Sequence, residues 1–310
     1  MELYFLGTNA GVPSLQRNVT AIALRILEER RSMWLFDCGE GTQHQILKSP
    51  LKLSKLEKVF ITHLHGDHLF GLPGLLSSRA YQGGTTPLEL YGPKGIKAFI
   101  EMSLELSQSR INYDLKVIEH DGGIIFEDDQ FVVESALLDH RIDSYGYRIT
   151  EKDRPGKLDL EQLKQHGVKP GPIYGKLKRG EAVELGDGLV LHPHQVLGSP
   201  KKGRIVTILG DTRPAPNVVP LARGADVLVH EATFLHELVD TAYEYHHSTA
   251  VQAAEAAKQA GVGQLIMTHF SSRYKDLDEL TPLLEEARGI FPASFVAEEH
   301  KLYPVVEKQG

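Results

Sequence analysis

The sequence predicts an α/β fold that carries one inserted segment. Short strand-forming runs are followed by helical patterns twice along the chain. Polar residues stand at the carboxyl ends of four apolar strands, which is where sites of α/β folds gather. Residues 151–193 are instead rich in Lys, Gly and Pro and have weak periodicity. We therefore expect a single domain over 1–310 with an inserted arm at about 151–193.

The first half of the chain begins with strand patterns and then turns to helical spacing of apolar residues. The expected strands cover Glu2–Leu6, Val19–Ile26, Met33–Asp37 and Lys58–Thr62, and the expected helices cover Gly71–Gln82 and Lys94–Gln108. Val19–Ile26 and Met33–Asp37 form a hairpin pattern. Lys58–Thr62 is apolar enough to be buried and passes directly into the segment HLHGDH.

The second half returns to strands, and three of them end in polar motifs. The expected strands cover Phe131–Leu138, 144–149, Arg204–Leu209, Asp226–His230 and Gln264–Thr268. Arg204–Leu209 enters GDTRP, Asp226–His230 enters EATF, and Gln264–Thr268 delivers His269. His246–Ala260 reads as a helix, with Ser248 and Thr249 as start signals.

Composition excludes several classes of protein. The chain has 310 residues, of which 41% are hydrophobic and 24% charged, and this is typical of a globular protein. Its net charge of −7 disfavours a protein coated with nucleic acid, because phosphate contacts need Lys and Arg. The single cysteine, Cys38, favours a reducing compartment and reads as a core residue. With no signal-peptide or membrane-span pattern, we expect a cytoplasmic protein without membrane association.

The run His63-x-His65-x-Asp67-His68 is the strongest chemical signal in the sequence. In an extended chain alternate residues project to one side, so His63 and His65 can address one metal ion. Asp67 and His68 are adjacent and can reach a second ion. Imidazole and carboxylate are the ligands of Zn²⁺ and its neighbours.

Further ligands can be nominated from their positions at strand ends. Asp211, His269 and His140 each follow an apolar strand, and His230 and His247 are further candidates. Each of these residues taken singly fits a structural or surface role as well as a metal site. Their shared position favours a common site.

The order of these motifs resembles the metallo-β-lactamase-fold hydrolases, and most closely the ribonuclease Z family of tRNA 3′-processing endonucleases. The segments that carry the resemblance are FLGTNAGVP, WLFDCGEGTQHQIL, FITHLHGDHLFGLPGLL, YGPKGIKAFI, SYGYRI, KPGPIYGKLKRG, GDTRP, HEATF and HHST. They extend over nearly the whole chain. The resemblance implies a metallo-β-lactamase-type αββα four-layer sandwich with a flexible arm.

The resemblance also implies the contents of the site. It assigns one zinc ion to His63, His65 and His140, a second to Asp67, His68 and His269, and a bridging position to Asp211. Mn²⁺ or Fe²⁺ would suit the same ligands. By the same resemblance Asp67 is the proton acceptor, His247 assists at the scissile phosphate, and Glu231 orients His247, although a structural role for Glu231 stays open. Two bound ions activate water for attack on a phosphodiester.

The segment KPGPIYGKLKRG contains Lys169, Lys176, Lys178 and Arg179 and no acidic residue. Such a run can be merely a solvated loop, but on an acidic chain it also suits phosphate contact. It resembles the arm with which ribonuclease Z holds precursor tRNA, commonly as a homodimer in which each arm serves the other subunit. Arg17 is a further expected RNA contact. Leu15 stands where the family often has lysine.

Two other functions fit part of the same sequence pattern. Another metal-dependent phosphodiesterase or thioester hydrolase of the same fold would share HLHGDH but would not need the basic arm. A non-catalytic, metal-dependent RNA-binding protein would not need Asp67 and His247. The sequence therefore favours an endoribonuclease that removes the 3′ trailer from precursor tRNA and leaves a tRNA 3′-hydroxyl.

Overall fold

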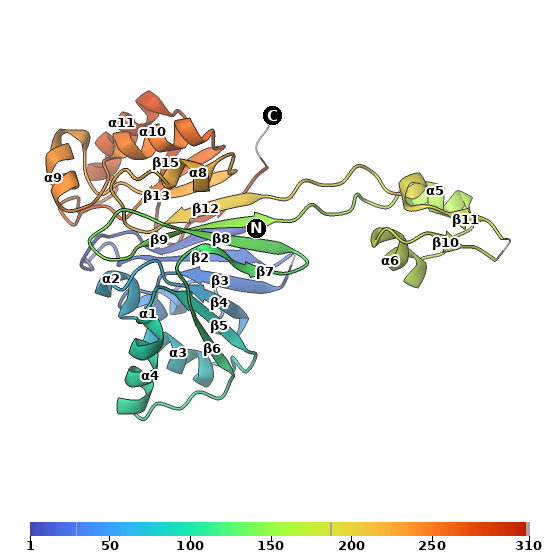
Figure 1. The fold of residues 1–310 in the computed structure, drawn as a ribbon, viewed down its shortest axis with the longest axis horizontal. Helices are drawn as coiled ribbons and strands as arrows, with labels where there is room; N and C mark the ends of the chain where they lie inside the picture. The colour runs from blue at the N-terminus through green and yellow to red at the C-terminus, as the bar shows by residue number, and fades with distance from the viewer. Residues whose placement is uncertain (29, 187, 308–310) are drawn as a thin grey trace.

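Two seven-stranded sheets face each other and carry helices on their outer faces. The computed structural model describes residues 1–28, 30–186 and 188–307. Figure 1 shows the resulting four layers, with α1, α3 and α4 on one side and α8, α10 and α11 on the other. This is the αββα sandwich that the family resemblance implies.

The first sheet is built mainly from the N-terminal half of the chain. Its strands, in spatial order, are β16 (Leu302–Pro304), β1 (Glu2–Gly7), β2 (Ala21–Ile26), β3 (Ser32–Phe36), β4 (Leu56–Phe60), β5 (Leu88–Gly92) and β6 (Leu115–Glu119). The expected hairpin is present as the antiparallel pair β2–β3, and β3 to β6 run parallel. The C-terminal strand β16 closes the edge beside β1.

The second sheet has the same design in the C-terminal half. Its order is β15 (Ser294–Val296), β14 (Gln264–Thr268), β13 (Val227–Glu231), β12 (Ile205–Leu209), β9 (Tyr145–Glu151), β8 (Phe131–Leu137) and β7 (Gly123–Glu127). The strands β12 to β15 are parallel, so their carboxyl ends meet at one edge. This edge is where the polar motifs of the sequence are delivered.

The helices cover the sheets through apolar faces. Those on the first sheet are α1 (Thr42–Leu47), α2 (Gly66–Leu69), α3 (Leu72–Tyr81) and α4 (Ile96–Leu106), with the 3₁₀ turn η1 (Leu53–Lys55). Those of the second half are α8 (Val218–Ala222), α9 (Val239–Glu244), α10 (Ala250–Ala260) and α11 (Thr281–Ile290), with the 3₁₀ turns η2 (His236–Leu238) and η3 (Asp278–Leu280). Among the described helices none is both long and apolar enough to cross a bilayer.

One expected helix begins later than its sequence pattern. The helix expected over His246–Ala260 starts at Ala250, because the Thr249 side chain accepts a hydrogen bond from the Gln252 amide and caps it. His246 has a positive φ of 59°, which turns the chain before the cap. The residues from His246 to Ser248 are therefore left in a loop that faces the site.

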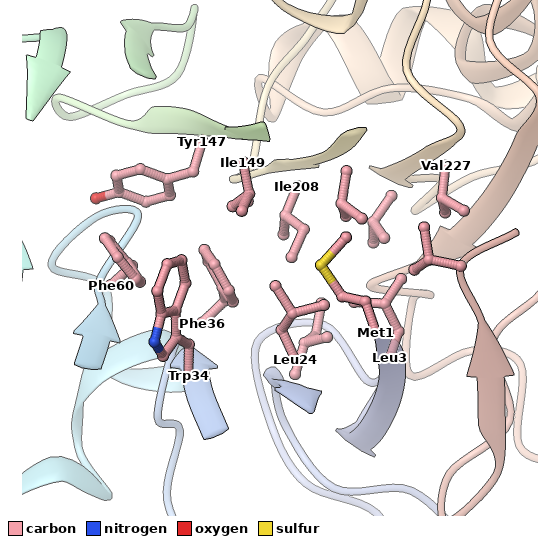
Figure 2. Packing of buried hydrophobic residues seen from close by; sticks show 14 of the residues in the cluster. Met1, Leu3, Leu24, Trp34, Phe36, Phe60, Tyr147, Ile149, Ile208 and Val227 are labelled. Atoms are coloured by element: carbon pink, nitrogen blue, oxygen red, sulfur yellow. The ribbon is translucent and has the colours of Figure 1, made fainter. Parts of the chain in front are cut away.

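The sheets are joined by a continuous apolar layer, which Figure 2 shows from close by. Trp34, Phe36 and Phe60 of the first sheet meet Tyr147 and Ile149 of the second. The Phe36 and Phe60 rings stack 4.9 Å apart, and the Tyr147 ring lies 5.4 Å from that of Phe60. Each such buried side chain stabilises the fold by about 1.5–3 kcal/mol. This layer sets the separation of the two sheets at the site edge.

The segment between β9 and β12 projects from the sandwich as a long arm (Figure 1). Its elements are α5 (Leu160–Gln165), α6 (Pro172–Lys178), β10 (Val183–Glu184), β11 (Val190–Leu191) and α7 (Pro193–Val196). Arg154 and Lys201 form an antiparallel bridge near its root. The projecting segment thus continues past residue 193, the boundary expected from the sequence, toward β12.

The distal part of the arm has a small apolar core of its own. Leu163, Leu177 and Leu191 are fully buried there, and Val196 is nearly so. Asp159 caps α5 by accepting hydrogen bonds from two backbone amides. The weak periodicity of this segment hid these short elements, because none spans more than two helical turns.

Candidate metal centre

The carboxyl ends of strands from both sheets deliver polar side chains to one place. His63 and His65 follow β4, His140 follows β8, and Asp211 and His269 follow β12 and β14. Gly210 permits this approach, since a Cβ built there would lie 2.6 Å from the Thr62 Cβ and 2.7 Å from the Ser144 Oγ. All seven ligands predicted from the sequence fall within the groups that could hold metal.

The first group contains His63, His65 and His140. The His140 Nε2 lies 3.2 Å from the His65 Nδ1, and the rings of His63 and His140 are 5.1 Å apart. His140 donates from Nδ1 to the backbone carbonyl of His246 at 2.9 Å. That bond leaves the His140 Nε2 free of a proton and aimed at the group.

The second group contains Asp67, His68 and His269. The Nε2 atoms of His68 and His269 are 3.2 Å apart, and they lie 3.5 Å and 3.3 Å from the Asp67 Oδ2. Tetrahedral coordination at about 2.0–2.1 Å separates ligand atoms by about 3.3 Å. The spacing of these three atoms therefore suits a single metal ion. Unlike the extended chain assumed from the sequence, Asp67 and His68 lie on the short helix α2.

Asp211 lies between the two groups. Its carboxylate oxygens are 3.7 Å from the His63 Nε2, 3.4 Å from the His68 Nε2 and 3.3 Å from the His269 Nε2. Asp211 is 3% exposed, so its charge is screened little by water. A carboxylate in this position can bridge two ions.

The electrostatics of the cluster reflect its burial. Burial lowers the pKa of His63 well below its usual value, and the neighbouring His68 lowers it further. Burial alone would raise the pKa of Asp211, but His269, His68 and His63 hold it well below its usual value. The buried His63 Nε2 has no hydrogen-bond partner. An ionised carboxylate beside an unpartnered imidazole nitrogen is a donor set that a cation would satisfy.

Asp37 lies on the outer side of the histidines and holds their rings in place. Its role was not predicted from the sequence. Its Oδ2 accepts from the His68 Nδ1 at 2.7 Å and from the Thr62 Oγ1 at 2.8 Å. The Thr62 Oγ1 in turn lies 3.0 Å from the His63 Nδ1 and accepts its proton. Asp37 thus orients two histidines with their Nε2 atoms toward the centre. Its position directly after β3 is the same strand-end signal that found the ligands.

Glu231 orients histidines in the same way as Asp37, but on the side of the centre formed by His247 and His269. Its Oε1 lies 2.8 Å from the His247 Nδ1, and its Oε2 accepts from the Thr233 Oγ1 at 2.7 Å. The Thr233 Oγ1 is 3.3 Å from the His269 Nδ1. Burial alone would lower the pKa of His247, but Glu231 raises it to about 9. His247 is therefore an imidazolium held next to Asp211, 3.9 Å from its Oδ2.

A loop over residues 8–18 holds Asp67 from the solvent side. The Gly11 amide donates to the Asp67 Oδ2 at 2.7 Å. The Glu299 Oε1 accepts from the amides of Thr8 and Asn18, at 3.0 Å and 2.8 Å, and so clamps both ends of the loop. A cavity of about 700 Å³ lies beside this clamp.

Replacing Glu299 by glutamine is expected to change how stability depends on pH. Burial raises the pKa of Glu299 to about 7, against the hydrogen bonds of Asn18 and Thr8. The unfolded chain ionises at lower pH, so the wild type loses stability as pH rises from about 4.5 to 7. The melting temperature of Glu299→Gln minus that of the wild type should therefore increase from pH 5 to pH 8.

Glu298→Gln is the matched control, because its carboxylate is paired with Lys301 at the surface. Its melting temperature should keep a constant offset from the wild type. A constant offset for Glu299→Gln as well would contradict this account of its burial.

Other residues singled out in the sequence lie elsewhere. Arg17 is 5% exposed and donates to the backbone carbonyls of Ser271, at 3.3 Å, and Tyr274. It therefore supports the loop in this structure, and the RNA contact expected of it stays a prediction, whereas Leu15 is fully exposed. His230 is buried and bonded to the Glu231 carbonyl. Cys38 is buried and burial raises its pKa, which makes it a core residue.

The four arm cations are exposed. Lys169, Lys176 and Lys178 face solvent, and the Arg179 guanidinium is 2.7 Å from the Glu181 carboxylate. The arm returns to the sandwich at β12, which begins at Ile205. The chain then reaches the edge of the sheet that carries the site, near Asp211. At about 3.3 Å per residue, the arm leaves the sheet about 20 Å from the metal centre of its own chain.

Comparison with known proteins places these features in context. The chain is 54% identical over 308 residues to the ribonuclease Z of Anoxybacillus flavithermus, covering 99% of this chain and 98% of that protein. It is 56% identical over 306 residues to a ribonuclease Z of Bacillus cereus, covering 98% and 99%. Residues 1–122 match the family model described as anti-Pycsar protein Apyc1.

Solved structures show the same architecture. The crystal structure of the short form of human tRNase Z has a TM-score of 0.72 and 32% identity, and the match covers 99% of this chain and 100% of that one. The metallo-β-lactamase fold protein YhfI from Bacillus subtilis has a TM-score of 0.67 at 17% identity, with coverage of 97% and 98%. The second likeness concerns the fold alone.

Proposed function

The chain belongs to the ribonuclease Z family, and from this premise we propose how it removes the 3′ trailer from precursor tRNA. It is a metal-dependent endoribonuclease that hydrolyses a phosphodiester bond in tRNA 3′ processing. The observation that carries the proposal is the pair of ligand groups joined at Asp211. The proposed reaction is attack of water on the phosphodiester, which leaves the tRNA with a 3′-hydroxyl.

The proposed cofactor is two Zn²⁺ ions per chain, although Mn²⁺ or Fe²⁺ would suit the same ligands. The residues present fit this proposal, because outer hydrogen bonds turn the nitrogens of four histidines inward. His63, His65 and His140 would hold one ion and Asp67, His68 and His269 the other, with Asp211 between them. Such ions, when bound, lower the pKa of water and neutralise charge that develops on the phosphate.

Metal analysis of purified, undialysed protein should find two divalent ions per chain. Asp211→Ala should lose both, because its oxygens contact histidines of both groups. Asp121→Ala is the control, since Asp121 is exposed on the loop between β6 and β7. One ion or none in the wild type would contradict the dinuclear proposal.

The proton transfers are assigned to residues around the centre. Asp67 is assigned as the acceptor of the attacking water's proton, because its carboxylate lies among the ligands of the second group, where a water on the ions would be placed. His247 is protonated at neutral pH, since Glu231 raises its pKa to about 9. It can therefore stabilise the scissile phosphate and donate to the leaving 3′-oxygen of the tRNA. Glu231 positions His247 through the 2.8 Å bond.

The tRNA body is assigned to the arm. Lys169, Lys176, Lys178 and Arg179 give it a local positive charge on an acidic chain. Because the arm leaves the sheet at the edge opposite its own metal centre, we assign it to the site of a second copy. This requires a homodimer, as the family resemblance implies.

The direct test is incubation of the purified protein with a 3′-extended tRNA precursor, followed by mapping of the cut. The expected products are a tRNA with a 3′-hydroxyl and a trailer with a 5′-phosphate. A chain that hydrolyses small phosphodiesters or thioesters but leaves the precursor intact would instead be another hydrolase of the same fold.

A further inference from the structure

An exposed rim of two tyrosines and two arginines borders the His140 side of the metal centre. The rim consists of Arg141, Arg213, Tyr243 and Tyr245. Tyr243 is 62% exposed and Tyr245 is 50% exposed, although both belong to a segment that leads into the site. Large exposed aromatic side chains beside a site are typical of binding surfaces.

Each tyrosine is braced by one arginine. The Arg213 guanidinium lies 4.4 Å from the centre of the Tyr243 ring, and the Arg141 guanidinium lies 5.4 Å from that of Tyr245. Arg213 is itself fixed by the Asp139 carboxylate at 2.9 Å. The rings are therefore supported by a cation, and their exposure leaves area for a further planar group.

The rim is tied to the metal centre through backbone and neighbouring residues. Arg141 directly follows His140, and Arg213 comes two positions after Asp211. The His140 Nδ1 donates a hydrogen bond to the backbone carbonyl of His246, which directly follows Tyr245. The rim and the proposed metal ligands therefore share the same loops, and the inference places a group stacked on the rim beside the scissile phosphate.

The charges of the rim are nearly balanced. Asp139 pairs with Arg213, and Arg141 donates to the backbone carbonyl of Glu244, which is an exposed acidic residue. A surface of this kind has no excess of positive charge for phosphate contact. It favours a planar, uncharged group instead, and such stacking tolerates any base sequence.

The geometry points to a subsite in which Tyr243 and Tyr245 stack the unpaired nucleobases next to the scissile phosphate. The inference rests on the proposed function, because precursor RNA is the ligand. Stacking without base readout suits trailers of varied sequence. The rim thereby positions the strand for the attack, while the metal centre and Asp67 carry the chemistry.

The test measures KM and kcat of the full-length enzyme on a precursor tRNA, using Tyr243→Leu and Tyr245→Leu. Leucine keeps an apolar body but removes the ring. The double variant should raise KM about tenfold or more with a smaller change in kcat, and phenylalanine at both positions should restore KM. Cleavage of the unmodified precursor by the wild type is the separate check of the function itself.

A second measurement uses precursors that carry an abasic nucleotide on either side of the cut. The wild type should lose affinity for at least one of them, and the double leucine variant should lose no further affinity for that substrate. Additive losses would overturn the subsite. The control is Tyr81→Leu, an 89% exposed tyrosine at the end of α3, which should leave KM unchanged. An equal effect of Tyr81→Leu would also overturn it.

Discussion

Asp67→Ala is expected to reduce cleavage of precursor tRNA at least about a thousandfold, while tRNA binding changes little. The substitution removes the proposed proton acceptor and one ligand of the second group. It also leaves the His269 Nε2 without the Asp67 Oδ2 that lies 3.3 Å away. None of the exposed arm cations is affected, so the phosphate contacts proposed for them should remain.

Asp67→Asn separates the two roles of this carboxylate. Asparagine keeps an oxygen for a metal ion and for the Gly11 amide, but it cannot take up a proton. We expect Asp67→Asn to retain more metal than Asp67→Ala and to remain inactive at neutral pH. Single-turnover cleavage, filter binding of tRNA and metal analysis provide the three readouts. Cleavage near the wild-type rate by Asp67→Ala would rule out the mechanism.

The α/β fold class and the nomination of candidate ligands rest on strand patterns, whereas the four-layer sandwich and the division of the ligands into two sets rest on the family resemblance. Each metal-binding candidate follows an apolar run, and parallel strands in a sandwich bring such ends together. Asp37 follows the same rule, but it lies outside the motif that drew attention to His63 and His68. Its role depends on contact with Thr62, which is distant in sequence and appears only when the strands are paired.

The burial of individual side chains in loops was the property predicted least well from the sequence. Arg17 was nominated as an RNA contact with no expectation of burial, and its side chain packs under the loop against the Ser271 and Tyr274 carbonyls. A charged residue in a polar loop has no local signal for such burial, because the covering residues come from the C-terminal region. The small apolar core in the distal part of the arm was not predicted either, because its apolar residues are few and widely spaced in the sequence.

Removal of the arm is expected to separate tRNA cleavage from phosphodiester chemistry. Because Arg154 and Lys201 pair at its root, a short Gly-Ser linker can replace 155–200 without disturbing β9 or β12. The value of kcat/KM for precursor tRNA should fall about a hundredfold or more, whereas hydrolysis of bis(p-nitrophenyl) phosphate should change less than about twofold. The salt dependence of tRNA binding should weaken by about 0.7–0.9 in log–log slope for each phosphate contact that is lost. Equal losses on both substrates would contradict a separate binding role.

The position of the arm root makes a stronger form of this experiment possible. A heterodimer can be purified with two affinity tags, one on an arm-deleted chain with an intact centre and one on a full-length Asp67→Ala chain. Each chain alone should be inactive on precursor tRNA, the first because it cannot hold the tRNA and the second because it lacks the proton acceptor. If the arm serves the other subunit, the full-length chain supplies its arm to the intact centre, and about half of the wild-type activity should return. An inactive heterodimer would mean that the arm bends back to its own centre, about 20 Å along β12 from its root.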